Sequence, residues 1–131
     1  MVQGKSVILV IDDDEDIRDC MRSALVFDGY EVCLVENGPD ALRMLQNGSC
    51  TPALIIVDEY MVPMNGQTFI RVLAEAGLRT MPVILFSADH TIPKMCASCE
   101  ADACLLKPFE LDDLLSMVAD LLARKKVKQL V

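Results

Sequence analysis

Residues 7–16 have the sequence VILVIDDDED, in which five apolar side chains directly precede five acidic ones. A short, continuous apolar run that is rich in β-branched residues predicts a strand buried on both faces of a parallel sheet. Similar runs occur at residues 32–35, 53–57, 83–86 and 103–106. This first stretch therefore predicts a buried strand that ends in a group of acids.

The segments between these runs have apolar residues at helical spacing. The clearest are residues 69–76, residues 111–122 and the segment that contains Ile17, Cys20, Met21, Ala24 and Leu25. Residues 41–45 and 92–99 are shorter helix candidates, and Gly29 and Gly77 mark two helix ends. Strands that alternate with helices predict an α/β fold with a doubly wound, five-stranded parallel sheet.

Length and charge narrow the classes of function. The chain has 131 residues, the size of one domain, and a net charge of −8 from 12 basic and 20 acidic residues. Nucleic acids and anionic membranes require a cationic surface, so direct binding to either is not expected. No apolar run approaches the roughly 20 residues that span a bilayer, and no signal peptide precedes the first strand, so we expect a cytoplasmic domain.

The C-terminal residues allow two interpretations. Basic residues at positions 124, 125, 126 and 128 suit the carboxyl end of a helix, where cations complement the helix dipole. Residues 123–131 are alternatively a C-terminal tail, or a stub of a linker to an output domain. We therefore expect one domain over residues 1–131 and leave the role of its last residues open.

Six cysteines in a chain of this kind predict reduced thiols that pack as small apolar residues. An alternative is a zinc or redox site built on Cys96 and Cys99, with His90 and Cys104 nearby. However, Ile92, Met95, Cys96 and Cys99 share one helical face, which favours packing over metal binding.

Polar residues follow four of the five strands. They are Asp12 and Asp13, Asp58, Ser87, and Lys107. Parallel strands bring their carboxyl ends to one edge of the sheet, where ligands bind. Clustered carboxylates repel one another unless a cation neutralises them, and oxygen ligands of this kind favour Mg²⁺. A carboxylate beside the metal can accept a phosphoryl group, which a lysine and a hydroxyl would stabilise. The acids at positions 14–16 are instead expected at a helix N-terminus.

These motifs, in this order, resemble the receiver domain of bacterial two-component response regulators. The matching segments are VILVIDD at 7–13, LIIVD at 54–58, FSA at 86–88 and LKPF at 106–109, and Gly66 lies eight residues after Asp58. The resemblance extends from about Val7 to about Leu122. It implies a flavodoxin-like fold with strand order 2-1-3-4-5, an arrangement for which the chemotaxis regulator is a known example.

The resemblance also implies roles for individual residues. Asp58 would accept the phosphoryl group, and Asp12, Asp13, Asp58 and the backbone carbonyl of Tyr60 would hold Mg²⁺. Lys107 would pair with the phosphoryl group and Ser87 would hydrogen-bond it. The peptide before Pro108 would be cis. Tyr60 and Asp89 would border the access path and influence how long the phosphoryl group survives.

Three positions depart from the family pattern. Pro63 lies one residue later than usual, which puts the backbone around Tyr60 in question. Cys104 occupies the position of the aromatic switch residue, so the usual inward turn of a ring is replaced by another readout. Asn65 replaces a common aspartate, which a turn tolerates.

The resemblance predicts phosphorelay signal transduction. A sensor histidine kinase or a histidine phosphotransfer protein would donate the phosphoryl group, and the change would switch protein–protein contacts with an unknown downstream protein. The last two strand–helix units would form the output face, and a phosphorylation-dependent dimer is left open. We expect no turnover enzyme, at most slow self-dephosphorylation.

Two other classes of protein share parts of this pattern. An aspartate-nucleophile phosphatase of the haloacid dehalogenase type would use Asp12-x-Asp14, but its later acidic pair and cap insertion are not evident. A flavodoxin-like flavin protein would place the flavin phosphate beside the acids after the first strand, which would repel it.

Overall fold

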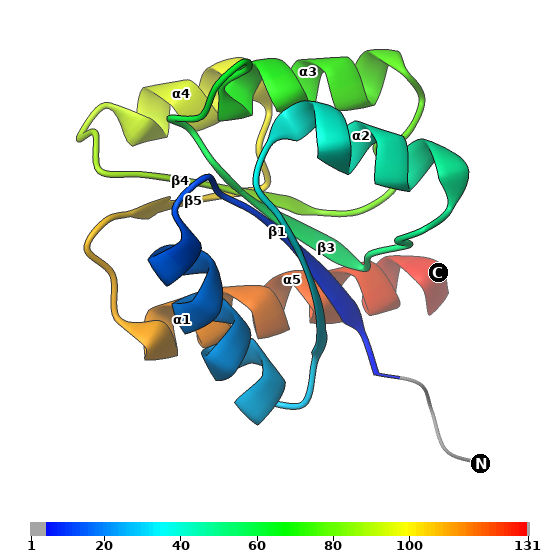
Figure 1. The fold of residues 1–131 in the computed structure, drawn as a ribbon. Coiled ribbons are helices and arrows are strands. Elements are labelled where there is room, and N and C mark those ends of the chain that lie inside the picture. Colours follow the sequence, from blue (N-terminus) through cyan, green and yellow to red (C-terminus); the bar gives the residue numbers. More distant parts are fainter. Residues whose placement is uncertain (1–4, 131) are drawn as a thin grey trace.

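The five strands form one parallel sheet in the order β2-β1-β3-β4-β5 (Figure 1). The computed structural model describes the backbone of residues 5–130 and the side chains of residues 5–124. The strands are β1 (Val7–Ile11), β2 (Glu31–Val35), β3 (Leu54–Asp58), β4 (Val83–Ser87) and β5 (Ala103–Leu106). The predicted strand order and the five predicted strands are confirmed.

Continuous apolar runs form the centre of this sheet because both of its faces are covered. Adjacent residues of β3, such as Ile55 and Ile56, are both fully buried, and so are Ile84 and Leu85 of β4. Successive side chains of a strand point to opposite faces, so each run must fill two cores. The edge strands β2 and β5 are more exposed.

The helices divide between the two faces of the sheet. The structure contains α1 (Glu15–Phe27), α2 (Gly38–Asn47), α3 (Gly66–Glu75), α4 (Ile92–Cys99) and α5 (Leu111–Leu130). Helices α2, α3 and α4 cover one face, whereas α1 and α5 cover the other (Figure 1). Leu9 and Leu85 belong to the core on the first side, and Ile8 and Phe86 to the core on the second. The doubly wound α/β fold is thereby confirmed.

Side-chain caps set where several helices begin. Asp14 accepts hydrogen bonds from the backbone N–H groups of Asp16 and Ile17 at 2.9 and 3.4 Å, which makes it the N-cap of α1. The acids at positions 14–16 thus serve the helix N-terminus, as predicted. Asn65 caps α3 by accepting from the N–H of Thr68 at 2.8 Å, so the asparagine is well suited to this turn.

Three residues of the predicted apolar faces, Cys20, Ala76 and Leu111, lie in solvent instead. Cys20 is exposed on α1, because it is offset by about 100° from the buried Met21 around the helix axis. Leu111 is 40% exposed at the first residue of α5. The buried stripe of a helix is therefore narrower than the apolar spacing suggested.

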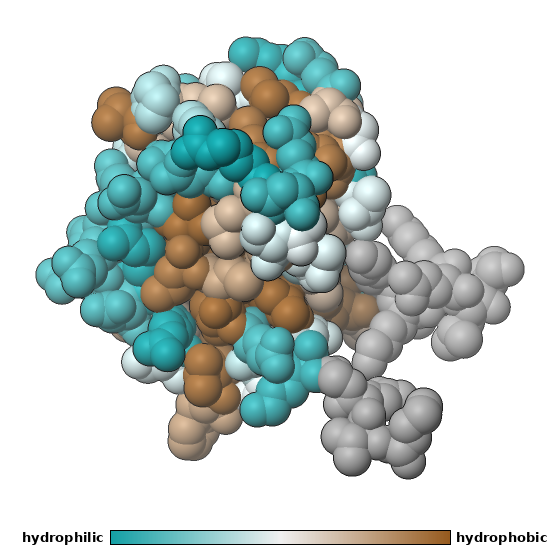
Figure 2. All heavy atoms as spheres, turned by 45° about the vertical axis from the view of Figure 1, so that its right-hand side comes forward, coloured by the Kyte–Doolittle hydropathy of each residue, from teal (hydrophilic) through white to brown (hydrophobic). Residues whose placement is uncertain are grey.

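None of the described helices is both long enough and apolar enough to cross a membrane. Figure 2 shows one face of the molecule, on which hydrophobic residues are interspersed with hydrophilic ones. Helix α5 extends to Leu130, but the basic side chains at positions 125, 126 and 128 lie outside the described residues. The interpretation of residues 123–131 as a tail or linker stays a prediction.

Candidate functional site

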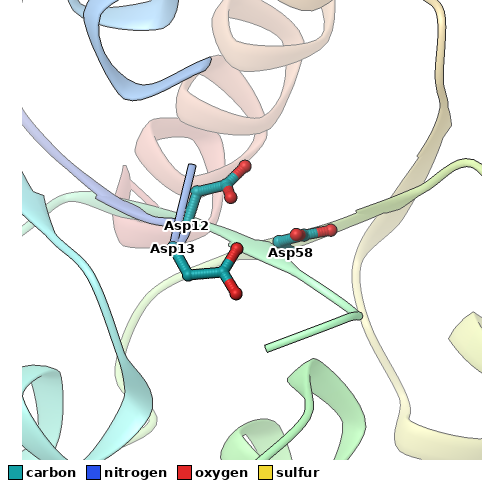
Figure 3. A group of neighbouring side chains, drawn as sticks. All are labelled: Asp12, Asp13 and Asp58. Carbon is teal, nitrogen blue, oxygen red and sulfur yellow. The ribbon is translucent and has the colours of Figure 1, made fainter. Parts of the chain in front are cut away.

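Three carboxylates meet at the carboxyl edge of the sheet. Asp12 and Asp13 follow β1, Asp58 ends β3, and Figure 3 shows the three side chains beside one another. Strands β1 and β3 are neighbours with Ile11 opposite Val57, so the next residue on each strand reaches the same level. One oxygen of each carboxylate lies within 4.8 Å of the others, which is a spacing that one metal ion can bridge.

Asp12 is the acid of this group whose negative charge is least balanced by hydrogen bonds and positive charges. It is fully buried, and its Oδ1 accepts a hydrogen bond from the backbone N–H of Asp14 at 2.9 Å. Its Oδ2 has no hydrogen-bond partner among the described residues. Burial raises the pKa of Asp12 from 3.8 to about 6, although the Asp14 N–H partly opposes this. A buried carboxylate oxygen with this surplus of negative charge is suited to a cation.

Lys107 brings a positive charge to the same acids. Its Nζ lies 3.3 Å from Asp58 Oδ1 and 3.7 Å from Asp12 Oδ2. The ammonium also lies 4.5 Å from the centroid of the Phe86 ring, in a cation–π contact. Burial raises the pKa of Asp58, whereas Lys107 and a hydrogen bond from the Tyr60 backbone lower it. The peptide between Lys107 and Pro108 is cis, as the resemblance implied.

Ser87 reaches the same edge of the sheet as the last residue of β4. It is fully buried, and its Oγ accepts a hydrogen bond from the backbone N–H of Asp89 at 3.0 Å. Its carbonyl accepts from the Lys107 N–H at 2.8 Å, which ties the ends of β4 and β5 together. The hydroxyl is thus held by its own loop.

A hydrogen bond joins the two loops that flank this edge. Tyr60, after β3, donates its hydroxyl to Asp89 Oδ2 at 2.6 Å. The other oxygen of Asp89 accepts from the N–H and Oγ1 of Thr91 at 2.8 and 2.7 Å. These hydrogen bonds, chiefly the one from Tyr60, lower the pKa of Asp89 to about 2 and raise that of Tyr60. The loops after β3 and β4 are therefore linked by a charge-assisted contact.

Access to Asp58 is narrow but not closed. The Asp58 side chain is 6% exposed, Lys107 is 20% exposed, and the neighbouring Asp13 is an exposed residue. Tyr60 is 56% exposed although its hydroxyl is bound to Asp89. The site therefore opens to solvent beside Asp13, and Tyr60 belongs to its accessible surface.

The loop after β3 contains two contacts that local sequence patterns did not reveal. Glu59 is buried and accepts from both the backbone N–H and the side-chain Nε2 of Gln67, at 3.0 and 2.8 Å. A Cβ atom at Gly66 would lie 2.7 Å from the Asp58 carbonyl oxygen. The spacing of Gly66 from Asp58 is the one signal that could have suggested this close approach.

The same loop contains a second cis peptide, between Val62 and Pro63. This is the proline that departs from the family pattern. Gly66 nevertheless begins α3, and its N–H donates to the Glu59 carbonyl at 3.0 Å. The N–H of Tyr60 donates to Asp58 and its hydroxyl donates to Asp89, whereas the role of its carbonyl as a metal ligand stays a prediction.

The zinc interpretation of the cysteines is not supported by the structure. All six thiols are free. Within residues 5–124, the acids Asp12, Asp13 and Asp58 are the single group of three or more potential metal ligands, so His90, Cys96, Cys99 and Cys104 do not converge on one ion. Cys104, partly buried on β5, packs against the core beneath α2–α4. Five of the six thiols lie in the core or pack against it, as predicted, whereas Cys20 is exposed.

Comparison with known proteins identifies the family. The response regulator receiver domain family matches residues 8–119. The chain belongs to this family. The response regulators MprA of Mycobacterium ulcerans and Mycobacterium avium are 34% and 35% identical to it over 123 and 121 residues. These matches cover 92% and 91% of the chain but 52% of each relative, so the chain spans about half the length of these curated relatives.

Solved structures of receiver domains agree with this assignment. A CheY-like receiver domain protein from Methanospirillum hungatei has a TM-score of 0.85 and 25% identity, over 95% of this chain and 99% of that one. The receiver domain of a signal transduction histidine kinase from Syntrophus aciditrophicus has a TM-score of 0.81 and 33% identity, with 90% of each chain covered. The comparisons therefore place the chain in the receiver domain family rather than in the haloacid dehalogenase or flavin protein families.

Proposed function

We propose that Asp58 of this receiver domain accepts a phosphoryl group in a Mg²⁺-dependent reaction. The observation that carries the proposal is the buried acidic cluster, in which Asp58 is paired with Lys107 at 3.3 Å and Asp12 Oδ2 has no hydrogen-bond partner among the described side chains. Such a cluster needs a cation, and the carboxylate at its centre is a nucleophile that a lysine already contacts.

The residues present fit a magnesium ion. Asp12, Asp13 and Asp58 offer oxygens within 4.8 Å of one another, and the Tyr60 carbonyl would add a fourth protein ligand. Oxygen ligands and partial exposure at Asp13 suit an ion that keeps several of its waters. When bound, Mg²⁺ would neutralise charge on the phosphoryl oxygens.

Asp58, Lys107 and Ser87 have different roles in the transfer of the phosphoryl group. An Asp58 carboxylate oxygen attacks the phosphorus of a phosphohistidine, a new O–P bond forms, and the P–N bond breaks with its electron pair leaving on the imidazole. Lys107 stabilises the charge on the transferring group and then on the acyl phosphate. The Ser87 hydroxyl, which accepts from the Asp89 N–H, donates its own hydrogen to a phosphoryl oxygen and so couples the modification to the loop after β4.

The donor is a sensor histidine kinase or a histidine phosphotransfer protein, and the product acts through a downstream protein rather than through turnover of a substrate. In this proposal residues 123–131 are a tail or linker, and the last two strand–helix units face the partner. Phosphorylation shifts the balance between two conformations of that surface. The change at β5 then proceeds through backbone shifts. Cys104 is too small to replace the aromatic ring that turns inward at this position in the family.

The test is phosphorylation of the purified chain with acetyl phosphate in Mg²⁺. We expect one acid-stable, hydroxylamine-sensitive phosphoryl group that is absent after chelation and absent in Asp58→Asn. Lys107→Ala should slow the reaction by about 100-fold, the usual cost of removing one group that stabilises transition-state charge. Asp16→Asn, which alters an exposed acid at the start of α1, is the matched control and should react normally.

Phosphoryl label that persists in Asp58→Asn would overturn the proposal. The proposal would also be overturned if Asp12→Asn lost the label while the parent chain was fully labelled without metal. Circular dichroism spectra of the variants should match that of the parent chain. A folded Asp58→Asn variant without label ties the chemistry to this carboxylate rather than to the fold.

A further inference from the structure

Two thiols lie in contact at the edge of the sheet, away from the acidic site. Cys33 is on β2, and Cys50 is in the connection between α2 and β3. Their sulfur atoms are 3.1 Å apart, with the Cys50 thiol donating to Cys33 Sγ. The two residues are 17 positions apart in sequence, so the fold brings them together.

The two thiols differ in exposure and in their part in the hydrogen bond. Cys33 is partly exposed, whereas Cys50 is 4% exposed. Burial, together with the neighbouring Cys33, raises the pKa of Cys50 to about 12, so Cys50 stays protonated and serves as the donor. The partly exposed Cys33 sulfur accepts the hydrogen bond from Cys50, and cysteines react with oxidants through their sulfur as the thiolate. Cys33 is therefore the thiol that an oxidant meets first.

The surrounding backbone permits a bond between the two sulfurs. A disulfide requires a separation of about 2.05 Å, which is about 1 Å less than the 3.1 Å observed. Cys33 is fixed in the ladder of β2, where it lies opposite Leu9. Cys50 belongs to no helix or strand, and its N–H reaches the Met44 carbonyl at a long 3.4 Å. The connection before β3 can thus supply the movement.

We propose that Cys33 and Cys50 form a reversible intramolecular disulfide when the protein meets a hydroperoxide. The Cys33 thiolate attacks the distal peroxide oxygen, which gives a sulfenic acid and releases the alcohol, or water from hydrogen peroxide. The Cys50 sulfur then attacks the Cys33 sulfur, and the sulfenic hydroxyl leaves as water with the Cys50 proton. Two thiols are oxidised by two electrons and one peroxide is reduced, so the step balances.

The other cysteines provide internal comparisons. Cys20 is exposed on α1, on the surface rather than in a pair with Cys33 or Cys50. Cys96 is buried in α4, and its thiol donates to the carbonyl of Ala103 at 3.6 Å. A single exposed thiol forms mixed or intermolecular products, and a buried thiol reacts slowly. Cys96 also has Cys104 as a hydrogen-bonded neighbour, and the direct sulfur contact of 3.1 Å between Cys33 and Cys50 predicts that these two form the bond.

The experiment is brief treatment of the full chain with a stoichiometric amount of hydrogen peroxide, followed by alkylation, trypsin digestion and mass spectrometry. Trypsin leaves Cys33 within residues 23–43 and Cys50 within residues 44–71, with one cysteine in each peptide. We expect these peptides to be joined in a product that has lost two hydrogen atoms and that dithiothreitol restores. In Cys50→Ser, dimedone should trap a sulfenic acid at Cys33, whereas Cys20→Ser should behave as the parent chain.

The oxidised protein should also unfold at a higher temperature than the reduced protein, because the bond closes a loop between β2 and the start of β3. Preferential oxidation of Cys20, a bond within the peptide that carries Cys96 and Cys104, or no change in mass under these conditions would each overturn the proposal. The mass readout does not depend on phosphorylation, so it is independent of the function proposed for Asp58.

Discussion

The ionised Asp12 side chain lowers the free energy of unfolding more clearly than any other group of the site. It is fully buried, and one of its oxygens lies 3.7 Å from an ammonium that is closer to Asp58. Burial raises its pKa from 3.8 to about 6, so the folded protein binds this proton more tightly than the unfolded chain does. With respect to this group, the free energy of unfolding is highest below about pH 4 and falls as the pH rises to about 6.

This cost can be measured with Asp12→Asn in metal-free protein. At about pH 7.5 the substitution should raise the free energy of unfolding by up to about 3 kcal/mol, the equivalent of the pKa shift. At about pH 3, below both pKa values, Asp12 is protonated in the folded and the unfolded state and the gain should nearly vanish. Urea unfolding of both proteins at several pH values checks this, with Asp16→Asn as a control that should show no such pH dependence. An equal gain at both pH values would contradict the assignment of the cost to ionised Asp12.

At the scale of elements, the loops after β3 and β4 are joined by one side-chain contact between Tyr60 and Asp89. Because the pKa of Asp89 is lowered to about 2, its carboxylate is charged over the whole working pH range and keeps this hydrogen bond. The two loops therefore move together near the path to Asp58, and we expect the contact to slow the approach of water.

Tyr60→Phe removes the hydroxyl and keeps the ring. We expect the acyl phosphate to be lost several-fold faster, because the hydrogen bond that links the two loops is removed. Tyr30→Phe, which alters the other tyrosine of the chain, in the connection between α1 and β2, is the matched control. The lifetime is measured after the donor is removed by rapid gel filtration. An unchanged or longer lifetime in Tyr60→Phe would show that the contact does not restrict the site.

The junction of β3 and α3 depends on the absence of a side chain at Gly66. A Cβ atom there would lie 2.7 Å from the Asp58 carbonyl oxygen and 2.6 Å from Leu85 Cδ1. Since backbone cannot yield easily, Gly66→Ala should lower the free energy of unfolding by about 1–3 kcal/mol, as other overpacked substitutions do. It should also slow phosphorylation, because the helix would push the end of β3.

Gly38→Ala provides the comparison for Gly66→Ala in urea unfolding. A Cβ atom at Gly38 would also meet atoms at 2.7 Å, but these belong to the flexible side chain of Met64. That side chain can rotate away, so the stability of Gly38→Ala should stay close to that of the parent chain. Equal losses in the two variants would mean that the nature of the contacted atoms does not matter.

For the whole molecule, the sequence predicted what depends on periodicity. Runs such as Val7–Ile11 located all five strands, since a strand that fills two cores must be apolar at every position. Strand ends then predicted that Asp12, Asp13 and Asp58 would meet, because topology alone brings them to one edge. The family resemblance supplied the strand order and the individual roles.

Contacts that depend on rotamers and loop conformation could not be predicted in this way. The hydrogen bond between Tyr60 and Asp89 joins residues 29 positions apart, and the thiol pair of Cys33 and Cys50 joins two separate elements. Neither contact has a periodic pattern in the sequence. The prediction that Cys20 lies on the buried face of its helix was wrong, because apolar spacing defines a helical stripe only to within one residue on each side.

The acidic edge exists only when β1, β3 and β5 are assembled, so an ion that binds there must stabilise the entire fold. The unfolded chain cannot hold Asp12, Asp58 and Lys107 together, and mass action then favours the folded state. At a Mg²⁺ concentration 100 times the dissociation constant, the free energy of unfolding rises by about 2.7 kcal/mol, which should raise the Tm by several degrees.

Because the chain carries a net charge of −8, sodium chloride at equal ionic strength is the necessary control for screening. The extra stabilisation by Mg²⁺ should disappear in Asp13→Asn, whose side chain is exposed and whose loss should leave the fold intact. Equal melting curves in the two salts would mean that the three carboxylates do not bind the ion.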